Sequence, residues 1–178
     1  GIHLAKKGIK TAIFEKEAFP HHKVCGEYLS REVLPYFNLL GIEVLDLKPK
    51  NIQRLKYSTA KGNSLEVDLP LGGLGISRYV LDNLLFRTAL KNGAEVIQEK
   101  VTEVAFSKDH FKVTTSADKE YSAKYVFGAF GKRSLLDKKL ERGFFQKSAP
   151  WMAVKTHFTN KDFPVDLVAL HNFKGGYC

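Results

Sequence analysis

One carboxylate, Glu15, stands at the end of a short apolar segment, where it could bind a nucleotide. Residues 9–15 (IKTAIFE) are mostly apolar, which is typical of a parallel strand covered on both faces. They follow Gly8, which we expect to end a helix. At the carboxyl end of the second strand of a βαβ unit, an acidic side chain accepts hydrogen bonds from a ribose diol. The alternative is a solvated glutamate, because no glycine fingerprint precedes Glu15 in the sequence.

The loop that follows (FPHHKVCGE) carries a second group of candidate residues. The pair Cys25-Gly26 lets the backbone approach a flat or anionic ligand closely, and Lys23 would offset the charge of a pyrophosphate. Adjacent histidines such as His21 and His22 rarely share a metal ion, and no further ligand lies at a suitable spacing, so no metal site is expected. A nucleophilic Cys25 would need a lowered pKa and a base, and no partner stands out.

Helix and strand patterns alternate along the chain and place these residues in an α/β core. Serines cap two expected helices, one from Ser30 (or nearer Pro35) to Gly41 and one from Ser77 to about Gly93. The expected strands are residues 52–59, 64–69, 94–97, 101–106, 111–115, 120–122, 125–129, 152–158 and 165–171, with a glycine-rich stretch at 71–75. The order of these elements predicts a parallel core with antiparallel additions, including a meander over residues 101–122.

The composition is that of a globular protein. Hydrophobic residues make up 44% and charged residues 26% of the 178 residues, which excludes a disordered or low-complexity chain. The 28 Lys and Arg exceed the 19 Asp and Glu by 28 − 19 = 9, yet these basic residues are spread along the chain. This spread weakens the alternative of a nucleic-acid-binding module. No apolar run approaches the roughly 20 residues of a membrane helix, and two distant cysteines form no disulfide framework. We expect a cytoplasmic protein without a nucleic-acid partner.

Three stretches, taken in order, resemble flavoprotein oxidoreductases of the geranylgeranyl reductase type, within the para-hydroxybenzoate hydroxylase-like group. They are HLAKKGIKTAIFEKEAFPHHKVCGEYLS, GISRYVLDNLLFRTALKNGAEVI and YVFGAFGKRS. The tail AVKTHF…HNFKGGYC resembles the start of that family's substrate domain. No single stretch is decisive, and the ordered set carries the resemblance.

The resemblance implies an FAD-binding Rossmann-like domain of the glutathione reductase type over residues 1–137, with a β-meander insert. It implies that residues 138–178 begin an antiparallel-sheet substrate domain, to which residues 45–75 also contribute. The implied cofactor-binding residues are Glu15, Lys16, Lys23, Cys25, Gly26, Arg78, Val101, Gly128, Ala129 and Gly131. The family's usual Gly-Ala-Asp-Gly segment reads Gly-Ala-Phe-Gly here, so Phe130 stands in place of an aspartate.

The implied activity is that of an FAD-dependent oxidoreductase acting on an isoprenoid, lipid or other hydrophobic small molecule. NAD(P)H or a ferredoxin-like protein would supply the electrons, and association with a membrane surface is left open. An FAD-dependent monooxygenase and a halogenase are the alternatives, although Trp151 lacks the tryptophan-rich context of halogenases. A plain NAD-binding Rossmann protein is disfavoured by the expected meander. The catalytic residues are unknown.

The two ends of the sequence look like internal positions of a longer protein. The chain opens without Met on what we interpret as the last turns of a helix, and it stops at Gly175-Gly176-Tyr177-Cys178 without a terminal element. We expect a glycine fingerprint upstream and a Gly-Asp segment downstream. We also expect that residues 1–178 alone do not hold FAD tightly.

Overall fold

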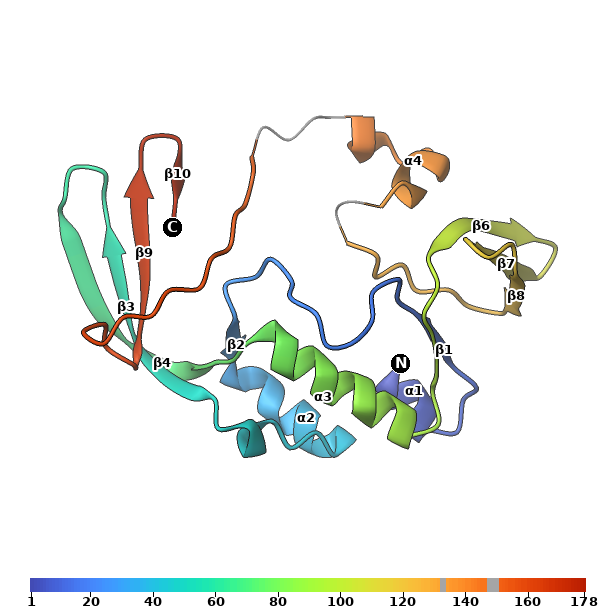
Figure 1. Cartoon of the computed structure of the whole chain (residues 1–178), viewed down its shortest axis with the longest axis horizontal. Coiled ribbons are helices and arrows are strands. Elements are labelled where there is room, and N and C mark those ends of the chain that lie inside the picture. The colour runs from blue at the N-terminus through green and yellow to red at the C-terminus, as the bar shows by residue number, and fades with distance from the viewer. Residues whose placement is uncertain (132–133, 147–150) are drawn as a thin grey trace.

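The computed structural model describes residues 1–131, 134–146 and 151–178, and the strands within these ranges form three sheets (Figure 1). A parallel pair joins β1 (Ala12–Phe14) to β5 (Glu95–Ile97). A five-stranded sheet has the order β10-β9-β3-β4-β2, and a three-stranded sheet has the order β6-β7-β8. The chain is therefore a mixed α/β protein, as its sequence pattern predicts. Lys132 and Arg133, in the third of the resembling stretches, lie outside the described residues.

The βαβ-like core is built from small residues. Helix α1 (Ile2–Lys6) contacts α3 (Arg78–Lys91), and Ala5, Ala89 and Ala94 form one buried cluster there. Because alanine side chains are short, the two helices and the start of β5 approach closely. Gly8 has a φ of 74°, and this left-handed turn after α1 leads the chain into β1, as predicted. Strand β1 then ends directly before Glu15, whose N–H donates to the carbonyl of Ile97 at 3.1 Å.

The second helical region follows the predicted capping pattern. Ser30 Oγ accepts from the N–H of Glu32, which starts the 3₁₀ turn η1 (Arg31–Val33), and α2 (Leu34–Leu40) continues from it. Pro35 falls in the first turn of α2, where its missing N–H costs nothing. Gly41 ends the helix with a φ of 72°. The main core joins this region to η2 (Val44–Leu47), β4 and α3, and its buried members are Phe37, Leu40, Ile42, Val44, Leu74, Ile76 and Leu81.

The five-stranded sheet joins segments that are far apart in the sequence. Its strands are β2 (Tyr28–Ser30), β3 (Lys50–Ser58), β4 (Ser64–Gly75), β9 (Leu167–Phe173) and β10 (Gly176–Tyr177). Strand β3 pairs with β9 in parallel, and the Arg54 guanidinium binds both carboxylate oxygens of Asp166 at 2.8 and 2.9 Å. The glycine-rich stretch 71–75 is not a separate loop but the end of β4. A Cβ at Gly73 would lie 2.2 Å from the Tyr28 ring, so the Tyr28 side chain packs directly over this glycine.

The predicted meander is confirmed. It consists of β6 (Val101–Ser107), β7 (His110–Thr115) and β8 (Glu120–Ala123), all antiparallel. Buried Thr115 donates from Oγ1 to the Glu99 carboxylate at 2.5 Å, and Lys119 pairs with the same carboxylate at 2.6 Å. These contacts attach the meander to the chain that leaves β5.

Two predicted strands are wrong. Residues 125–129 and 152–158 form no strand, because neither segment has a hydrogen-bonding neighbour strand among the described residues. Tyr125 and Phe127 are 79% and 78% exposed, whereas the prediction had buried them. The short helical turns α4 (Leu136–Lys139) and η3 (Gly143–Gln146) lie between the two segments. Within the described parts of the chain, no helix is long and apolar enough to cross a membrane.

Candidate functional site

The candidate site starts at Glu15, which lies at the carboxyl end of β1, the edge where parallel sheets bind nucleotides. Its side chain is partly buried and held in place from two directions. Oε1 accepts from the N–H of Glu17 at 3.2 Å, and Oε2 pairs with Lys23 Nζ at 3.3 Å. Burial raises the pKa of Glu15, but the Glu17 N–H and the Lys23 charge outweigh it and keep the pKa below its usual value. Glu15 is therefore an ionised acceptor at the strand end.

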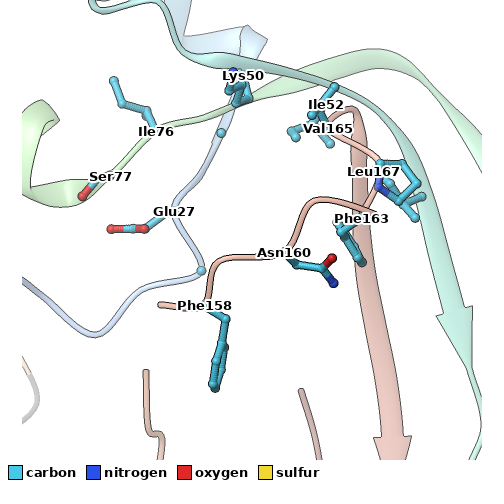
Figure 2. A pocket seen from close by; sticks show the side chains of 13 residues that line it. Glu27, Lys50, Ile52, Ile76, Ser77, Phe158, Asn160, Phe163, Val165 and Leu167 are labelled. Carbon is cyan, nitrogen blue, oxygen red and sulfur yellow. The ribbon is translucent and has the colours of Figure 1, made fainter. Parts of the chain in front are cut away.

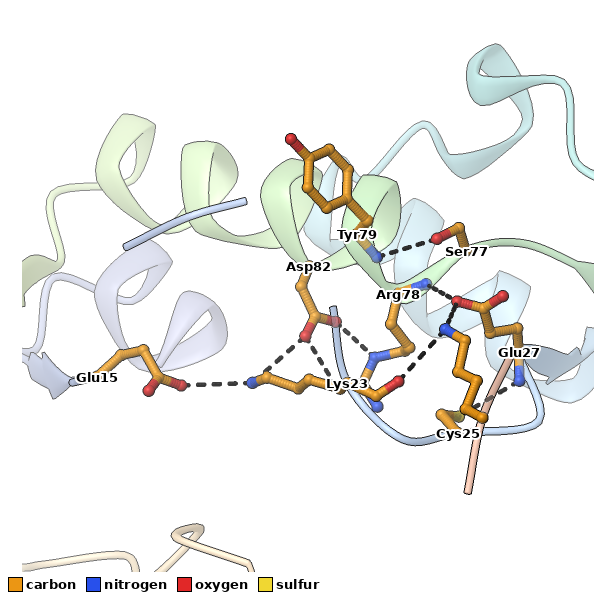
Figure 3. Close-up of polar contacts among 9 residues, drawn as sticks. Glu15, Lys23, Cys25, Glu27, Ser77, Arg78, Tyr79 and Asp82 are labelled. Atoms are coloured by element: carbon orange, nitrogen blue, oxygen red, sulfur yellow. Dashed lines mark hydrogen bonds and ion pairs between the residues drawn. The ribbon is translucent and has the colours of Figure 1, made fainter. Parts of the chain in front are cut away.

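Lys23 and Arg78 converge on Asp82 of α3, a residue that the sequence analysis missed (Figure 3). The Arg78 guanidinium binds both oxygens of Asp82 at 2.7 and 2.9 Å, and Lys23 Nζ lies 3.4 Å from Oδ2. The Asp82 side chain is only 6% exposed. Burial by itself raises the pKa of Asp82, and the Arg78 hydrogen bonds with the two cationic charges lower it overall. The spacing of four residues between Arg78 and Asp82 was the available signal, because such residues share a helix face.

We call the loop over residues 16–27 the site loop. Cys25 and Gly26 lie near its end, where it turns toward the start of α3. The N–H of Glu27 donates to Cys25 Sγ at 3.4 Å, and the hydrogen bonds to Asp82 are the main cause that raises the pKa of Arg78. No atom lies within 4 Å of a Cβ built on Gly26, so the backbone there is open to a ligand. The site loop and the start of α3 therefore link Glu15, Lys23 and Arg78 through Asp82.

Glu27 is the second residue that the sequence analysis missed. Its carboxylate accepts from the Arg78 N–H at 2.9 Å, from Lys155 Nζ at 2.5 Å and from His157 Nε2 at 3.1 Å. Burial raises the pKa of Glu27, and the hydrogen bonds from Lys155, Arg78 and His157 then lower it to about 2. An acidic residue next to a glycine was the only local signal, and Lys155 follows 128 residues later, beyond the reach of any local pattern.

The remaining predicted site residues do not join this group. Lys16 is exposed and pairs with Glu17 at 3.3 Å. Val101 opens β6, opposite Thr115. The exposed segment after the meander contains Gly128, Ala129 and Gly131. Among the described residues, no side-chain hydrogen bond or ion pair connects this segment to the site loop.

Two cavities flank the site loop. One has a volume of about 680 Å³ and is shown in Figure 2. Glu27, Lys50, Ser77 and Asn160 form its polar part, and its apolar walls are Ile52, Ile76, Phe158, Phe163, Pro164, Val165 and Leu167. The other is about 330 Å³ and is lined by His22, Lys23, Val24, Lys155 and His157.

The residues present fit the hydroxyl groups of the ribose and ribityl chain of FAD better than its pyrophosphate. Asp82 uses Nε and one N–H of Nη2 of Arg78, which leaves three further guanidinium donors for a ligand. The start of α3 is already occupied, because the Arg78 N–H bonds to Glu27 and the Tyr79 N–H to Ser77. The carboxylates of Glu15, Glu27 and Asp82 also balance the charges of Lys23, Arg78 and Lys155. These residues are suited to hydrogen bonds with ligand hydroxyl groups and do not by themselves form a phosphate-binding site.

The fold resembles that of several solved enzymes, one of which was solved with FAD. The halogenase PltM, solved with phloroglucinol and FAD, matches with a TM-score of 0.66 at 18% identity, over 79% of this chain and 33% of its own. The p-nitrophenol 4-monooxygenase PnpA from Pseudomonas putida DLL-E4 matches with a TM-score of 0.66 at 18% identity, over 78% and 39%. The Diels-Alderase PyrE3 matches with a TM-score of 0.64 at 19% identity, over 79% and 31%.

The chain thus spans about a third of the length of the solved structures it matches. Searches of protein-family models and of curated proteins found no match to this sequence. At these identities the likeness establishes the fold alone.

Proposed function

We propose that this chain is the FAD-binding part of an FAD-dependent oxidoreductase. The observation that carries the proposal is Glu15, held ionised at the carboxyl end of β1 in a fold shared with a halogenase solved with FAD. Glu15 would accept from the adenosine ribose, Arg78 and Lys23 would contact the ribityl chain of the cofactor, and Gly26 would let the backbone come close. When bound, FAD supplies the redox chemistry, and the protein supplies binding and orientation.

The finer proposal concerns domains and substrate. Residues 1–137 form the FAD-binding domain and residues 138–178 begin the substrate domain, with residues 45–75 in the same sheet. The pairing of β3 with β9 supports this division, because it places the two segments side by side. The apolar cavity of about 680 Å³ would take a hydrophobic substrate, an isoprenoid or lipid if the chemistry is that of a geranylgeranyl reductase. NAD(P)H or a ferredoxin-like protein would donate the electrons.

The second candidate is an FAD-dependent monooxygenase or halogenase acting on an aromatic compound. It is favoured by the likeness to the solved structures of a p-nitrophenol 4-monooxygenase and of a halogenase in complex with phloroglucinol. NAD(P)H oxidation by the flavin-loaded protein separates the two candidates. A monooxygenase consumes O₂ when a phenol is added, whereas a reductase saturates an isoprenoid double bond without O₂.

The test of FAD binding compares the Glu15→Ala and Glu17→Ala variants of the intact protein. Glu17 is the matched control, because it is an exposed glutamate in the same loop. Loss of charged hydrogen bonds to the ribose should weaken FAD binding by about 1.5–3 kcal/mol, roughly 10- to 150-fold, only in Glu15→Ala. Flavin fluorescence titration measures this, and equal affinity in the two variants would remove Glu15 from the site.

A further inference from the structure

Glu27 connects three parts of the molecule that are distant in sequence. Its backbone has a left-handed φ of 56°, and its carbonyl accepts from the N–H of Ile76 at 2.9 Å. Its carboxylate accepts from the first residue of α3, Arg78, and from Lys155 and His157 of the segment before β9. The site loop, the helix start and the chain leading to β9 therefore meet at one side chain.

The carboxylate of Glu27 has little acceptor capacity left for a ligand. An ionised carboxylate offers about four lone-pair sites, and three hydrogen bonds from the protein already use them. Glu27 and Lys155 are also well covered, with side chains 18% and 16% exposed. A covered carboxylate with most of its acceptor sites used is suited to holding other groups in place, even though Glu27 borders the cavity of about 680 Å³ (Figure 2).

The group that Glu27 holds is a wall of that cavity. Residues 151–166 contain no helix or strand, and most of their side chains are exposed. Lys155 and Asp166 are the exceptions, and Lys155 Nζ also donates to the Lys23 carbonyl at 3.3 Å. His157, two residues later, packs its ring edge-on against His22 at 5.6 Å between centroids. Directly after this attachment, the segment contributes Phe158, Asn160, Phe163, Pro164 and Val165 to the cavity.

We propose that Glu27 is a positioning residue that fixes this cavity wall to the site loop, acting through Lys155 and His157. The proposal rests on the proposed function, because the wall would be the one that faces the substrate beside the FAD site. The alternating directions of the side chains along residues 154–158 explain how Glu27 can hold this segment. In an extended chain, residues 155 and 157 point to one side, toward Glu27, and Val154 and Phe158 are left free to face elsewhere.

The first test needs no cofactor and uses backbone NMR order parameters of residues 155–160 in the 178-residue chain. Wild type should give values near those of a rigid backbone, about 0.85, and Lys155→Met should lower them below about 0.6. Lys155→Arg should restore them, because it keeps a cationic donor toward Glu27. Glu27→Gln should act like Lys155→Met, whereas Glu17→Gln, in the same loop, should change nothing.

Lys155→Met keeps the inference testable even if Glu27→Gln fails to fold, because it leaves the bond from Glu27 to the start of α3 intact. Unchanged order parameters in Lys155→Met would overturn the inference. So would a failure of Lys155→Arg to restore them.

The second test separates this inference from the proposed function. In the intact protein, Lys155→Met should change the FAD dissociation constant less than about 3-fold, against roughly 10- to 150-fold for Glu15→Ala. A protein that binds no FAD but shows the NMR result would remove the proposed function and keep the attachment. FAD binding as weak in Lys155→Met as in Glu15→Ala would make Lys155 a cofactor ligand and overturn the positioning role.

Discussion

The site loop and the segment 125–131 differ in how the chain holds them, although the sequence assigns both to the same cofactor. The site loop is fixed by charged side chains that converge on Asp82 and Glu27. The segment 125–131 contains no charged residue and lies extended, with Tyr125 and Phe127 exposed. Its glycines would allow a ligand to approach the backbone closely, because they have no side chain. The site loop instead would contact a ligand through its charged side chains.

This difference suggests that the two regions would contribute to binding in different ways. A network of ion pairs holds its geometry before a ligand arrives, so the site loop would be preorganised. An extended glycine-containing segment takes its position from what packs against it. Changes in the site loop should therefore alter both the stability of the fold and ligand binding, whereas changes in the segment should alter binding alone.

The largest effect on stability is expected from Asp82→Ala. This change removes a buried carboxylate and leaves the positive charges of Arg78 and Lys23 without their shared partner. Removing one partner of a fully buried pair costs 3–5 kcal/mol, but both cations keep about a third of their surface in water, so we expect a loss of about 2–3 kcal/mol. Urea unfolding measures it. The control, Asp109→Ala, removes a nearly fully exposed carboxylate and should stay within about 0.5 kcal/mol. A similar result for both variants would show that the network does not hold the site loop.

Asp82 and Glu27 also show how far the sequence could predict this site. Ser30, Ser77, Gly8 and Gly41 were assigned correctly because capping depends on residues a few positions apart. Glu15 was placed at a strand end for the same local reason.

The contacts that complete the site are not local. Lys23 reaches Asp82 across 59 residues (82 − 23), and Glu27 reaches Lys155 across 128. The two wrong strands have the same origin, since alternation predicts an extended chain but does not predict a neighbour to pair with.

An intermediate effect is expected when the pH is lowered. The folded-state pKa of Glu27 is about 2, below its ordinary value of 4.5, so its contribution to stability is present above pH 4.5 and is lost as the pH falls toward 2. Because water reaches the edge of this group, we expect about 1–2 kcal/mol. Glu15 and Asp82 titrate in the same direction, so the measurement is the difference between wild type and Glu27→Gln in urea unfolding at pH 6 and pH 3. The free energies of unfolding of wild type and Glu27→Gln should differ less at pH 3 than at pH 6. An equal difference at both pH values would contradict the stabilising role of the Glu27 carboxylate.

The smallest effect on stability is expected from Gly128→Ala in the segment 125–131. The new Cβ would lie 2.9 Å from the edge of the Phe130 ring, and that ring is exposed enough to move aside. We therefore expect a change within about 0.5 kcal/mol, matching Gly143→Ala, where no atom lies within 4 Å of the added Cβ.

FAD affinity of the intact protein should separate these two glycine variants. If the segment approaches the cofactor through its glycine, Gly128→Ala should weaken FAD about 3- to 10-fold, roughly 0.7–1.4 kcal/mol, and Gly143→Ala should not. A loss of stability in Gly128→Ala with no change in FAD affinity would contradict the proposed difference between the site loop and the segment 125–131. The segment would then be a packed part of the fold, and the site loop with Glu15 would hold the cofactor without it.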